Sequence, residues 1–336
     1  MPPEPKQRVG SPASPSGSEP LTGTRGDTSA SGNDSLDGFL ARWKTVANQV
    51  DSALQATIDA MGVNCPARLR EAIAYSLLAP GKRLRPLLCI LASQAVGGSA
   101  EAAMPSAAAL EMIHAYSLIH DDLPAMDDDD LRRGRPTCHK QFCEATAILA
   151  GDALQPMAFQ MLAASGLPPN AIVESVLVLA RAAGPEGMVG GQMADLQAET
   201  RDIAAQTPED EQRTLDAIHR RKTGALITAA VELGAIAGNA TAEHRAALRE
   251  YGQSIGIAFQ IVDDLLDVEG TPENTGKATG KDSGRGKLTF PAVYGVASSR
   301  DQAHRWIERA SQAIAPLGES AQPLNWLAKY ILERSH

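Results

Sequence analysis

Aromatic residues are scarce in this sequence, and their scarcity argues against a protein built from strands. Only 4% of the 336 residues are Phe, Trp or Tyr, although 43% are hydrophobic. Much of the apolar content is Ala, Leu and Ile. Ala and Leu are strong helix formers, whereas strands favour aromatic and β-branched residues. The composition therefore predicts a helical protein with ample material for a core.

Cysteines are also few, and their spacing excludes two classes of protein. Cys65, Cys89, Cys138 and Cys143 form no C-x-x-C pair and are too sparse for a disulfide scaffold. We therefore expect reduced thiols in a cytoplasmic protein. Cys138, His139 and Cys143 could be zinc ligands. Because no fourth ligand lies at a recognisable spacing, we interpret them as ordinary helix and loop residues.

An excess of basic charge and long apolar runs are both absent. The formal net charge of −9 disfavours nucleic-acid binding, which usually needs a basic surface. An acidic enzyme can still bind an anionic substrate where metal ions and nearby Arg or Lys reverse the local field. No stretch of about 18 apolar residues occurs, and the N-terminus lacks the apolar segment of a secretory signal, so we expect no stable membrane anchor.

The sequence divides into a polar tail and a long helical region. Residues 1–35 are rich in Pro, Ser, Gly and Thr, and such a segment buries too little apolar surface to offset the entropy of ordering, which predicts a disordered tail. From residue 36 to residue 336, apolar residues recur every three or four positions and predict one all-helical domain. Thr207-Pro208 is typical of a helix start. The spacing predicts helices from residue 36 to about residue 50 and over 67–79, 84–96, 102–120, 143–164, 171–183, 211–237, 243–268, 289–297 and 322–333.

The first of two acidic clusters follows an apolar helix pattern. Six carboxylates lie among the ten residues from Asp121 to Asp130, and Arg132 and Arg133 come directly after them. Like charges at this density repel one another unless cations lie among them. An acidic run alone is usually a solvated loop, but the apolar helix before it and the two arginines after it favour a binding site.

The second acidic cluster lies inside an apolar helix pattern, in Phe259–Asp267. Asp263 and Asp267 are four residues apart and share one helix face, with Gln260 one turn earlier. Carboxylates among Leu, Ile and Val are unfavourable to bury unpaired, so this face contacts either water or metal, and we favour metal. Mg²⁺ is typically held by carboxylates together with substrate phosphates. Two facing clusters therefore predict a site for Mg²⁺ ions and a diphosphate.

Such a site needs basic residues for the remaining phosphate charge, and the sequence supplies them. Three cations lie within Gly81–Pro86 at a loop-to-helix junction, and Lys222 opens an apolar helix segment. Four more lie in a Gly-rich loop from Thr271 to Lys287, which could close over the site. This loop is not a P-loop, because GxxxxGK[ST] is absent and no strand precedes it.

Together these motifs resemble the polyprenyl synthetase family in residue type, order and spacing. The resemblance covers roughly residues 36–336, and His114–His120 is most similar to bacterial farnesyl diphosphate synthases. The motifs that carry the resemblance are Gly81–Pro86, His114–Arg133, Gly190-Gly191-Gln192 with Asp195, Lys222-Thr223 and Phe259–Asp267.

The resemblance implies an isoprenoid synthase fold, in which one large helical bundle surrounds a deep central cavity, and a homodimer. It also implies a head-to-tail prenyl transfer. An allylic diphosphate ionises, isopentenyl diphosphate attacks the allylic carbon, and a proton is lost to the departing diphosphate. The allylic substrates would be dimethylallyl and geranyl diphosphate. The cofactor would be Mg²⁺, with several ions per site and Mn²⁺ as a substitute.

The same resemblance implies a role for each site residue. Mg²⁺ would bind Asp121, Asp122 and Asp127 on one wall and Asp263 on the other, supported by Asp264 and Asp267. The residues that contact the allylic diphosphate would be Arg132, Lys222 and Lys277. Isopentenyl diphosphate would be held by Gly81, Lys82, Arg85, His114 and Arg133. Thr223 and Gln260 would face the developing carbocation. Lys287 matches a further lysine of the family pattern.

Two residues just before the first acidic cluster predict the length of the product. Ser117 lies one helical turn, roughly 5–6 Å, before Asp121 on the same face, so a prenyl tail growing away from the metal would run along it. A small Ser beside Tyr116, which could form the pocket floor, resembles the pattern of C15 producers. We therefore predict mainly (2E,6E)-farnesyl diphosphate, with geranylgeranyl diphosphate or another short-chain product as the alternative.

Three other functions fit parts of the pattern. An HD-type metal phosphohydrolase would explain His120-Asp121, but neither the second acidic cluster nor the cations of Gly81–Pro86. A terpene cyclase would share the first cluster, but its second cluster is typically an Asn/Ser/Glu pattern rather than the aspartates of Asp263–Asp267. A non-catalytic subunit of a heteromeric synthase tends to lose carboxylates, and both clusters are intact here.

Overall fold

Helices form almost everywhere that apolar residues recur at helical spacing. The computed structural model describes residues 36–199, 207–269 and 287–333, so the predicted tail at 1–35 lies outside the described residues. Within them the all-helical prediction is confirmed, since the other regular structure is one short hairpin. The elements are α1 (Leu36–Asp59), α2 (Ala67–Leu77), α3 (Leu84–Ala95), α4 (Ala100–Asp121), β1 (Leu131–Arg132), β2 (Arg135–Pro136), α5 (Cys138–Gln141), α6 (Glu144–Ala163), α7 (Pro169–Ala183), α8 (Met188–Glu199), α9 (Pro208–His219), η2 (Arg220–Gly224), α10 (Ala225–Ala237), α11 (Ala242–Glu269), α14 (Phe290–Tyr294), α15 (Val296–Ala313), η3 (Ala315–Ala321) and α16 (Gln322–Glu333).

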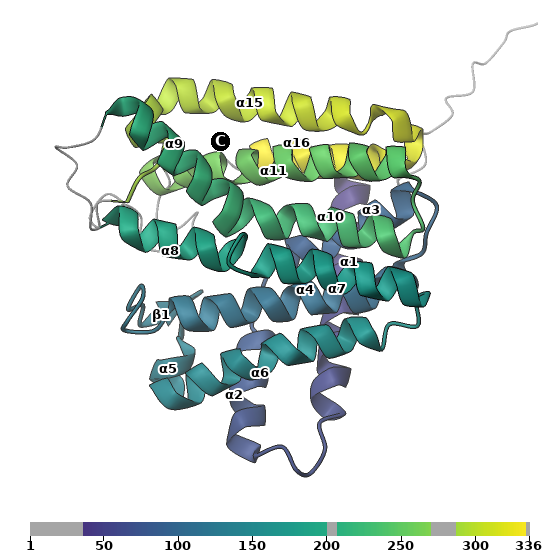
Figure 1. Ribbon diagram of the computed structural model, residues 1–336, viewed down its shortest axis with the longest axis vertical. Helices are drawn as coiled ribbons and strands as arrows, with labels where there is room; N and C mark the ends of the chain where they lie inside the picture. Colours follow the sequence, from purple (N-terminus) through teal and green to yellow (C-terminus); the bar gives the residue numbers. More distant parts are fainter. Residues whose placement is uncertain (1–35, 200–206, 270–286, 334–336) are drawn as a thin grey trace, which may run out of the picture.

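The long helices lie side by side in a stack. Figure 1 shows α15 along one edge, followed by α11, α10 and α4, with α6 and α2 toward the opposite edge. Helix α10 occupies the interior, because it packs against α3, α4, α7 and α11. Its side chains are apolar nearly all round, as expected of a helix covered on every side.

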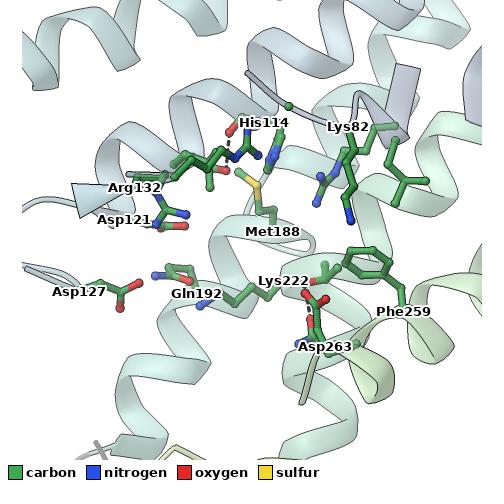
Figure 2. Close-up of a pocket in the computed structure, with 18 of the residues that line it drawn as sticks. Lys82, His114, Asp121, Asp127, Arg132, Met188, Gln192, Lys222, Phe259 and Asp263 are labelled. Atoms are coloured by element: carbon green, nitrogen blue, oxygen red, sulfur yellow. Dashed lines mark hydrogen bonds between the residues drawn. The ribbon is translucent and has the colours of Figure 1, made fainter. Parts of the chain in front are cut away.

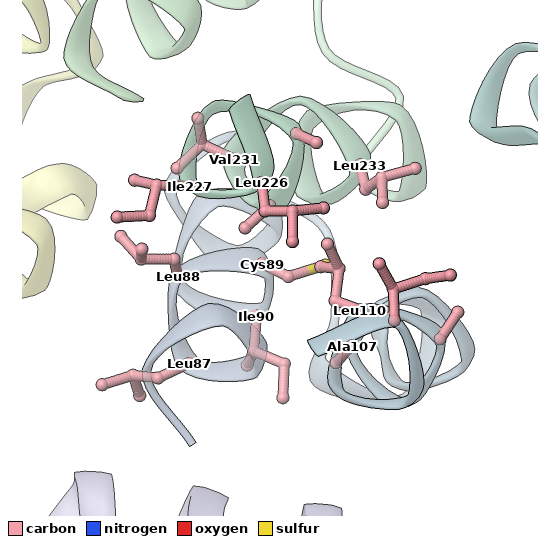
Figure 3. Packing of buried hydrophobic residues seen from close by; sticks show 14 of the residues in the cluster. Leu87, Leu88, Cys89, Ile90, Ala107, Leu110, Leu226, Ile227, Val231 and Leu233 are labelled. Carbon is pink, nitrogen blue, oxygen red and sulfur yellow. The ribbon is translucent and has the colours of Figure 1, made fainter. Parts of the chain in front are cut away.

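The centre of the core is the junction of α3, α4 and α10. Leu88, Leu110 and Val231, one from each helix, are fully buried there (Figure 3). Removing such side chains from water contributes about 1.5–3 kcal/mol each. Gly234 lets α10 approach α3 closely, since a Cβ atom there would lie 2.1 Å from the carbonyl oxygen of Cys89.

The structure agrees with the predicted helix start at residue 207. It also contains elements that the spacing did not predict, including α5, η3 and the part of α1 after residue 50. Thr207 caps α9, and its hydroxyl accepts a hydrogen bond from the amide of Asp210, as predicted. Helix α8 was not predicted, because its paired glycines have low helix propensity. The sequence spacing predicted only the first residues of α15. It also predicted a single helix over residues 211–237. The chain instead forms α9, a π-helical turn η2 and then α10.

The hairpin between α4 and α5 follows from its turn residues. Strands β1 and β2 pair Leu131 with Pro136 and Arg132 with Arg135. The two residues between them, Arg133 and Gly134, both have positive φ, at 53° and 73°. Two left-handed residues in a two-residue loop match the right-handed twist of the flanking strands.

Helices long and apolar enough to cross a membrane are absent from the part of the chain that the structure describes.

The close approach of α3 and α10 predicts the effect of one added methyl group. Alanine normally stabilises a helix by about 1 kcal/mol over glycine, but in Gly234→Ala the new methyl would collide with the Cys89 backbone. We expect a net loss of about 1–3 kcal/mol in the free energy of unfolding, measured by urea denaturation. Gly62→Ala is the matched control, because its Cβ would enter open space. A stabilised Gly234→Ala would contradict this packing.

Candidate active site

A cavity of about 1790 Å³ opens between the start of α3, the second half of α4, α8, η2 and α11. Sixteen of the residues predicted from sequence line it: Gly81, Lys82, Arg85, His114, Tyr116, Ser117, Asp121, Asp127, Arg132, Arg133, Lys222, Thr223, Gln260, Asp263, Asp264 and Asp267. Asp122 and Lys287 are not among its lining residues, and Lys277 lies outside the described residues. Figure 2 shows Asp121 and Arg132 across the cavity from Asp263, with Met188 and Gln192 between them.

The first acidic cluster is folded back on the end of α4 by backbone hydrogen bonds. The amide of Asp127 donates to the carbonyl oxygen of Asp121 at 2.8 Å, and that of Asp128 donates to Leu123 at 3.1 Å. Asp128 takes a left-handed conformation with φ 47°, which Asp tolerates better than most residues. The reversal returns Asp127 to the same cavity wall as Asp121.

The hairpin returns Arg132 to this cluster. Its guanidinium donates to both carboxylate oxygens of Asp122, with Nε at 2.8 and 3.0 Å and Nη2 at 2.6 Å. Although burial lowers the pKa of Arg132, the pairing with Asp122 raises it overall. Asp122 is only 3% exposed, so its role in the described conformation is to hold Arg132 in place.

Asp121 has no such bidentate partner among the described residues. Burial raises the pKa of Asp121 to about 6, Lys222 opposes this rise, and the negative charge of Asp127 adds to it. A carboxylate that ionises reluctantly beside other carboxylates is a group that a divalent cation would stabilise.

Lys222 and Thr223 reach the cavity from the π-helical turn η2. Widened turns of this kind are rare and often occur at functional sites, because they change the direction of side chains within a helix. Gly191 of α8 packs directly on this turn, and a Cβ there would lie 2.2 Å from the amide nitrogen of Lys222. The Lys222 ammonium pairs with Asp195 at 2.5 Å. Asp195 had been identified only as part of a motif, without a role.

A chain of hydrogen bonds orients the polar groups on α11. The hydroxyl of Thr223 donates to Oε1 of Gln260 at 2.8 Å, and Nε2 of Gln260 donates to Asp264 at 3.1 Å. Asp264 also accepts from the amide of Phe290 at 2.9 Å. Its carboxylate is 4% exposed and engaged on both oxygens. Asp263 and Asp267, by contrast, are partly exposed in the cavity.

A cationic patch of Lys82, Arg85 and Arg133 lies around the start of α3 and the hairpin loop. Lys82 and His114 line the cavity there (Figure 2), and Arg85 and Arg133 are also among its lining residues. Burial and the positive charges of Arg85 and Arg133 hold the pKa of His114 well below its usual value. At neutral pH, His114 is therefore an uncharged hydrogen-bonding group rather than a cation. Gly81 leaves room for Arg133, because a Cβ there would lie 2.6 Å from Nη1 of Arg133.

Lys287 bridges carboxylates at the edge of the cavity. Its ammonium lies 3.6 Å from Asp127, 3.6 Å from Glu199 and 3.9 Å from Asp195. It thus joins the first acidic cluster to α8. Neither Asp195 nor Glu199 was predicted as a site residue, although the Gly190-Gly191-Gln192 motif indicated that α8 mattered.

The pocket wall below Asp121 contains both residues predicted to set product length. Tyr116 is 5% exposed and packs edge-on against His120, with ring centroids 5.8 Å apart. His120 Nε2 lies 3.2 Å from the carbonyl oxygen of Ile148 on α6. Ser117 donates to the carbonyl oxygen of His114 at 2.9 Å, which keeps its hydroxyl on its own helix. Tyr116 therefore contributes a large ring to this wall, and Ser117 contributes a small side chain.

The predicted metal aspartates surround the cavity without converging on one point. Among the described residues, one group brings three ligand atoms within 4.8 Å of one another: the exposed Asp128 and Asp130 with the buried His139 of α5. There Asp130 pairs with Lys140 at 2.7 Å. Carboxylates without a cation between them repel. The partly exposed oxygens of Asp121, Asp127 and Asp263 fit Mg²⁺, which prefers oxygen ligands and retains water or phosphate.

Comparison with known proteins identifies the family. The model of the polyprenyl synthetase family matches residues 66–321. A farnesyl diphosphate synthase from Geobacillus stearothermophilus is 41% identical over 305 residues, which is 90% of this chain and 99% of that protein. Geranylgeranyl pyrophosphate synthase 7 of Arabidopsis thaliana is 44% identical over 295 residues, which is 86% of this chain and 82% of that protein.

A solved structure has the same fold. The apo structure of an FPP/GFPP synthase from Zymomonas mobilis superposes with a TM-score of 0.78 at 37% sequence identity, covering 89% of this chain and 100% of that chain. The predicted isoprenoid synthase fold is therefore confirmed. The names of these relatives include farnesyl and geranylgeranyl synthases, so they do not decide the product length.

Protons and divalent cations should compete for Asp121. Since the pKa of this carboxyl is about 6, a proton must leave before a cation binds at lower pH. We expect the affinity of the metal-free protein for Mn²⁺ to fall about tenfold for each pH unit below about 6. This affinity is measured from the concentration of free Mn²⁺, by electron paramagnetic resonance, at about pH 5 and about pH 7.5. Asp121→Asn should flatten this dependence, whereas Asp301→Asn, an exposed control, should preserve it. Equal wild-type affinity at both pH values would contradict the expectation.

Proposed function

The chain belongs to the polyprenyl synthetase family of head-to-tail prenyltransferases, and from this membership we propose that it condenses isopentenyl diphosphate with dimethylallyl and geranyl diphosphate. The main product we propose is (2E,6E)-farnesyl diphosphate. One observation carries the proposal: two carboxylate clusters and a separate cationic patch line the same cavity. A hydrolase or cyclase would have no use for that second, cationic site.

In the first step the allylic carbon–oxygen bond breaks. Arg132 and Lys222 would bind the departing diphosphate, together with Lys277, which lies outside the described residues. Asp121, Asp127 and Asp263 would hold Mg²⁺, with Asp267 in support, while Asp122 and Asp264 orient their neighbours. Mg²⁺, when bound, neutralises the charge that the leaving group gains. Fixed cations bind that charge more strongly in the transition state than in the ground state, which lowers the barrier.

The carbocation that remains needs a dry pocket and correctly oriented dipoles. Nε2 of Gln260 is committed to Asp264, so its Oε1 is the end that meets Thr223. The oxygens of these two side chains therefore present partial negative charge near the reacting carbon. Met188 and Phe259 contribute apolar surface to the cavity (Figure 2), which helps to exclude the water that would quench the cation.

In the second step isopentenyl diphosphate attacks. Lys82, Arg85 and Arg133 would hold its diphosphate, and the neutral His114 would donate a hydrogen bond. Its double bond forms the new carbon–carbon bond with the allylic cation, and the proton lost from the adjacent carbon passes to the departing diphosphate. Lys287 would remain a link between Asp127 and α8. A homodimer and a cytoplasmic location remain predictions from the sequence.

The condensation itself is tested with purified protein, isopentenyl diphosphate and dimethylallyl diphosphate. We expect farnesol as the main alcohol after dephosphorylation and chromatographic separation, with activity abolished by EDTA. Geranylgeraniol would retain the enzyme class and replace the C15 product. Release of phosphate without condensation, a cyclic hydrocarbon, or activity only with a partner chain would favour the hydrolase, cyclase or regulatory-subunit alternatives.

The pocket floor is tested at Tyr116. In Tyr116→Ala the ring proposed to form the pocket floor is lost, so the growing chain should pass this point and products of C20 or longer should dominate. The product spectrum from the same alcohol assay measures this shift. Tyr116→Phe keeps the ring and should retain the wild-type spectrum. An unchanged C15 product from Tyr116→Ala would show that another residue forms the floor.

A further inference from the structure

A buried arginine lies within the cationic patch between two of the residues proposed to bind isopentenyl diphosphate. Arg83 has a side chain that is 3% exposed, and it separates Lys82 from Arg85 in the sequence. Its backbone is left-handed, with φ 50° and ψ 40°, immediately before α3 begins. A non-glycine residue held in this conformation needs strong support from its surroundings.

All three guanidinium nitrogens of Arg83 are engaged within the protein. Nε donates to Asp51 of α1 at 2.7 Å, and Nη1 donates to Glu111 of α4 at 2.7 Å. Nη2 donates to the carbonyl oxygens of Leu77 at 3.3 Å and Ala79 at 2.9 Å, at the end of α2. This arginine therefore ties three helices to the loop that carries Lys82 and Arg85.

The neighbouring backbone of this loop is fixed as well. The indole of Trp43 donates to the carbonyl oxygen of Lys82 at 2.6 Å, and Arg133 donates to that of Pro80. Arg83 itself accepts the first hydrogen bond of α3, from the amide of Leu87 at 3.0 Å. The loop is thus held on both sides of Arg83, and the positions of its cations depend on these anchors.

Glu111 is the partner that relates Arg83 to substrate binding. It lies one helical turn before His114, is 5% exposed, and is a lining residue of the same cavity. Its negative charge acts on both Arg85 and Arg133. Among the described residues, Arg83 is the cation that forms an ion pair with Glu111. Without it, a buried carboxylate would face the incoming diphosphate and attract the cations meant for it.

We propose that Arg83 is a positioning residue for the isopentenyl diphosphate site: it neutralises Glu111, so that Lys82, Arg85 and Arg133 can bind a second diphosphate. Arg83 acts through these neighbours rather than through the reacting atoms. The inference rests on the proposed condensation, because that reaction supplies the second diphosphate.

Three variants separate this role from simple support of the fold. Arg83→Gln leaves Glu111 charged and unpaired, so the KM for isopentenyl diphosphate should rise about tenfold or more, while the KM for the allylic substrate stays within about twofold. Glu111→Gln removes the anion and should leave the KM for isopentenyl diphosphate unchanged or lower it. Arg83→Gln combined with Glu111→Gln should recover most of the loss, because the two changes are coupled.

The control is Arg68→Gln, in which an exposed arginine on α2 loses one hydrogen bond to the carbonyl oxygen of Phe142. The KM values for isopentenyl diphosphate and for the allylic substrate should both stay at wild-type values in this variant. Thermal unfolding of every variant identifies loss of fold. Should Arg83→Gln not fold, Glu111→Gln still decides the question: a purely structural ion pair predicts weaker isopentenyl diphosphate binding, and our proposal predicts equal or tighter binding.

Two further results would overturn the inference: a double variant no better than Arg83→Gln, or equal increases in both KM values. The affinity for inorganic pyrophosphate, measured by calorimetry in EDTA, distinguishes this failure from failure of the proposed function. It reports diphosphate binding by the cationic patch and requires neither metal nor turnover. A wild type that does not condense substrates would refute the proposed function. In that case, weaker pyrophosphate binding in Arg83→Gln and its recovery in the double variant would still support the positioning role, and their absence would refute it.

Discussion

Electrostatic repulsion around one cavity is the constraint on which the rest of this structure depends. Carboxylates from α4 and α11 line the same cavity. Their mutual repulsion is unfavourable, so packing elsewhere must hold these helices together. The buried apolar surface of α3, α4 and α10 supplies that packing, because these helices meet in a fully buried core. Burial is the main cause of the raised pKa of Asp121, and the negative charge of Asp127 raises it further, so the repulsion is only partly relieved within the protein itself.

The protein relieves part of this repulsion with fixed ion pairs and leaves part for ligands. Asp122 is paired with Arg132, and Asp195 with Lys222, so each pair positions a cation at the cavity without cancelling the neighbouring aspartates. Arg83 likewise forms an ion pair with Glu111, earlier on α4. Buried pairs of this kind add little net stability. Their contribution is directional, since they fix where positive and negative charge remain available for metal and diphosphate.

Pre-organisation extends to the uncharged groups. The Phe290 amide and Nε2 of Gln260 both donate to Asp264, and the Thr223 hydroxyl donates to Oε1 of Gln260. These hydrogen bonds determine which end of the Gln260 amide meets the Thr223 hydroxyl. Dipoles that are oriented before the reaction need no rearrangement when charge develops, and this is a major source of catalysis in water-excluded sites. The π-helical turn η2 makes the arrangement possible, because it directs Lys222 and Thr223 into the cavity from the end of a helix.

The sequence by itself determined the helical class, most of the helix ranges and the membership of the candidate site. Helical periodicity and charge clustering are local patterns, so Asp121, Lys82 and Asp263 could be identified from their own neighbours. Only the tertiary structure decided what each group does. Asp122 and Asp264 look identical to Asp121 and Asp263 in the sequence, yet Arg132 and the Phe290 amide engage them across long sequence separations. Helix α8, whose paired glycines have low helix propensity, and η2 also escaped prediction, and the two pack closely where Gly191 meets Lys222. Packing between distant segments overrides local propensity, and no local pattern records it.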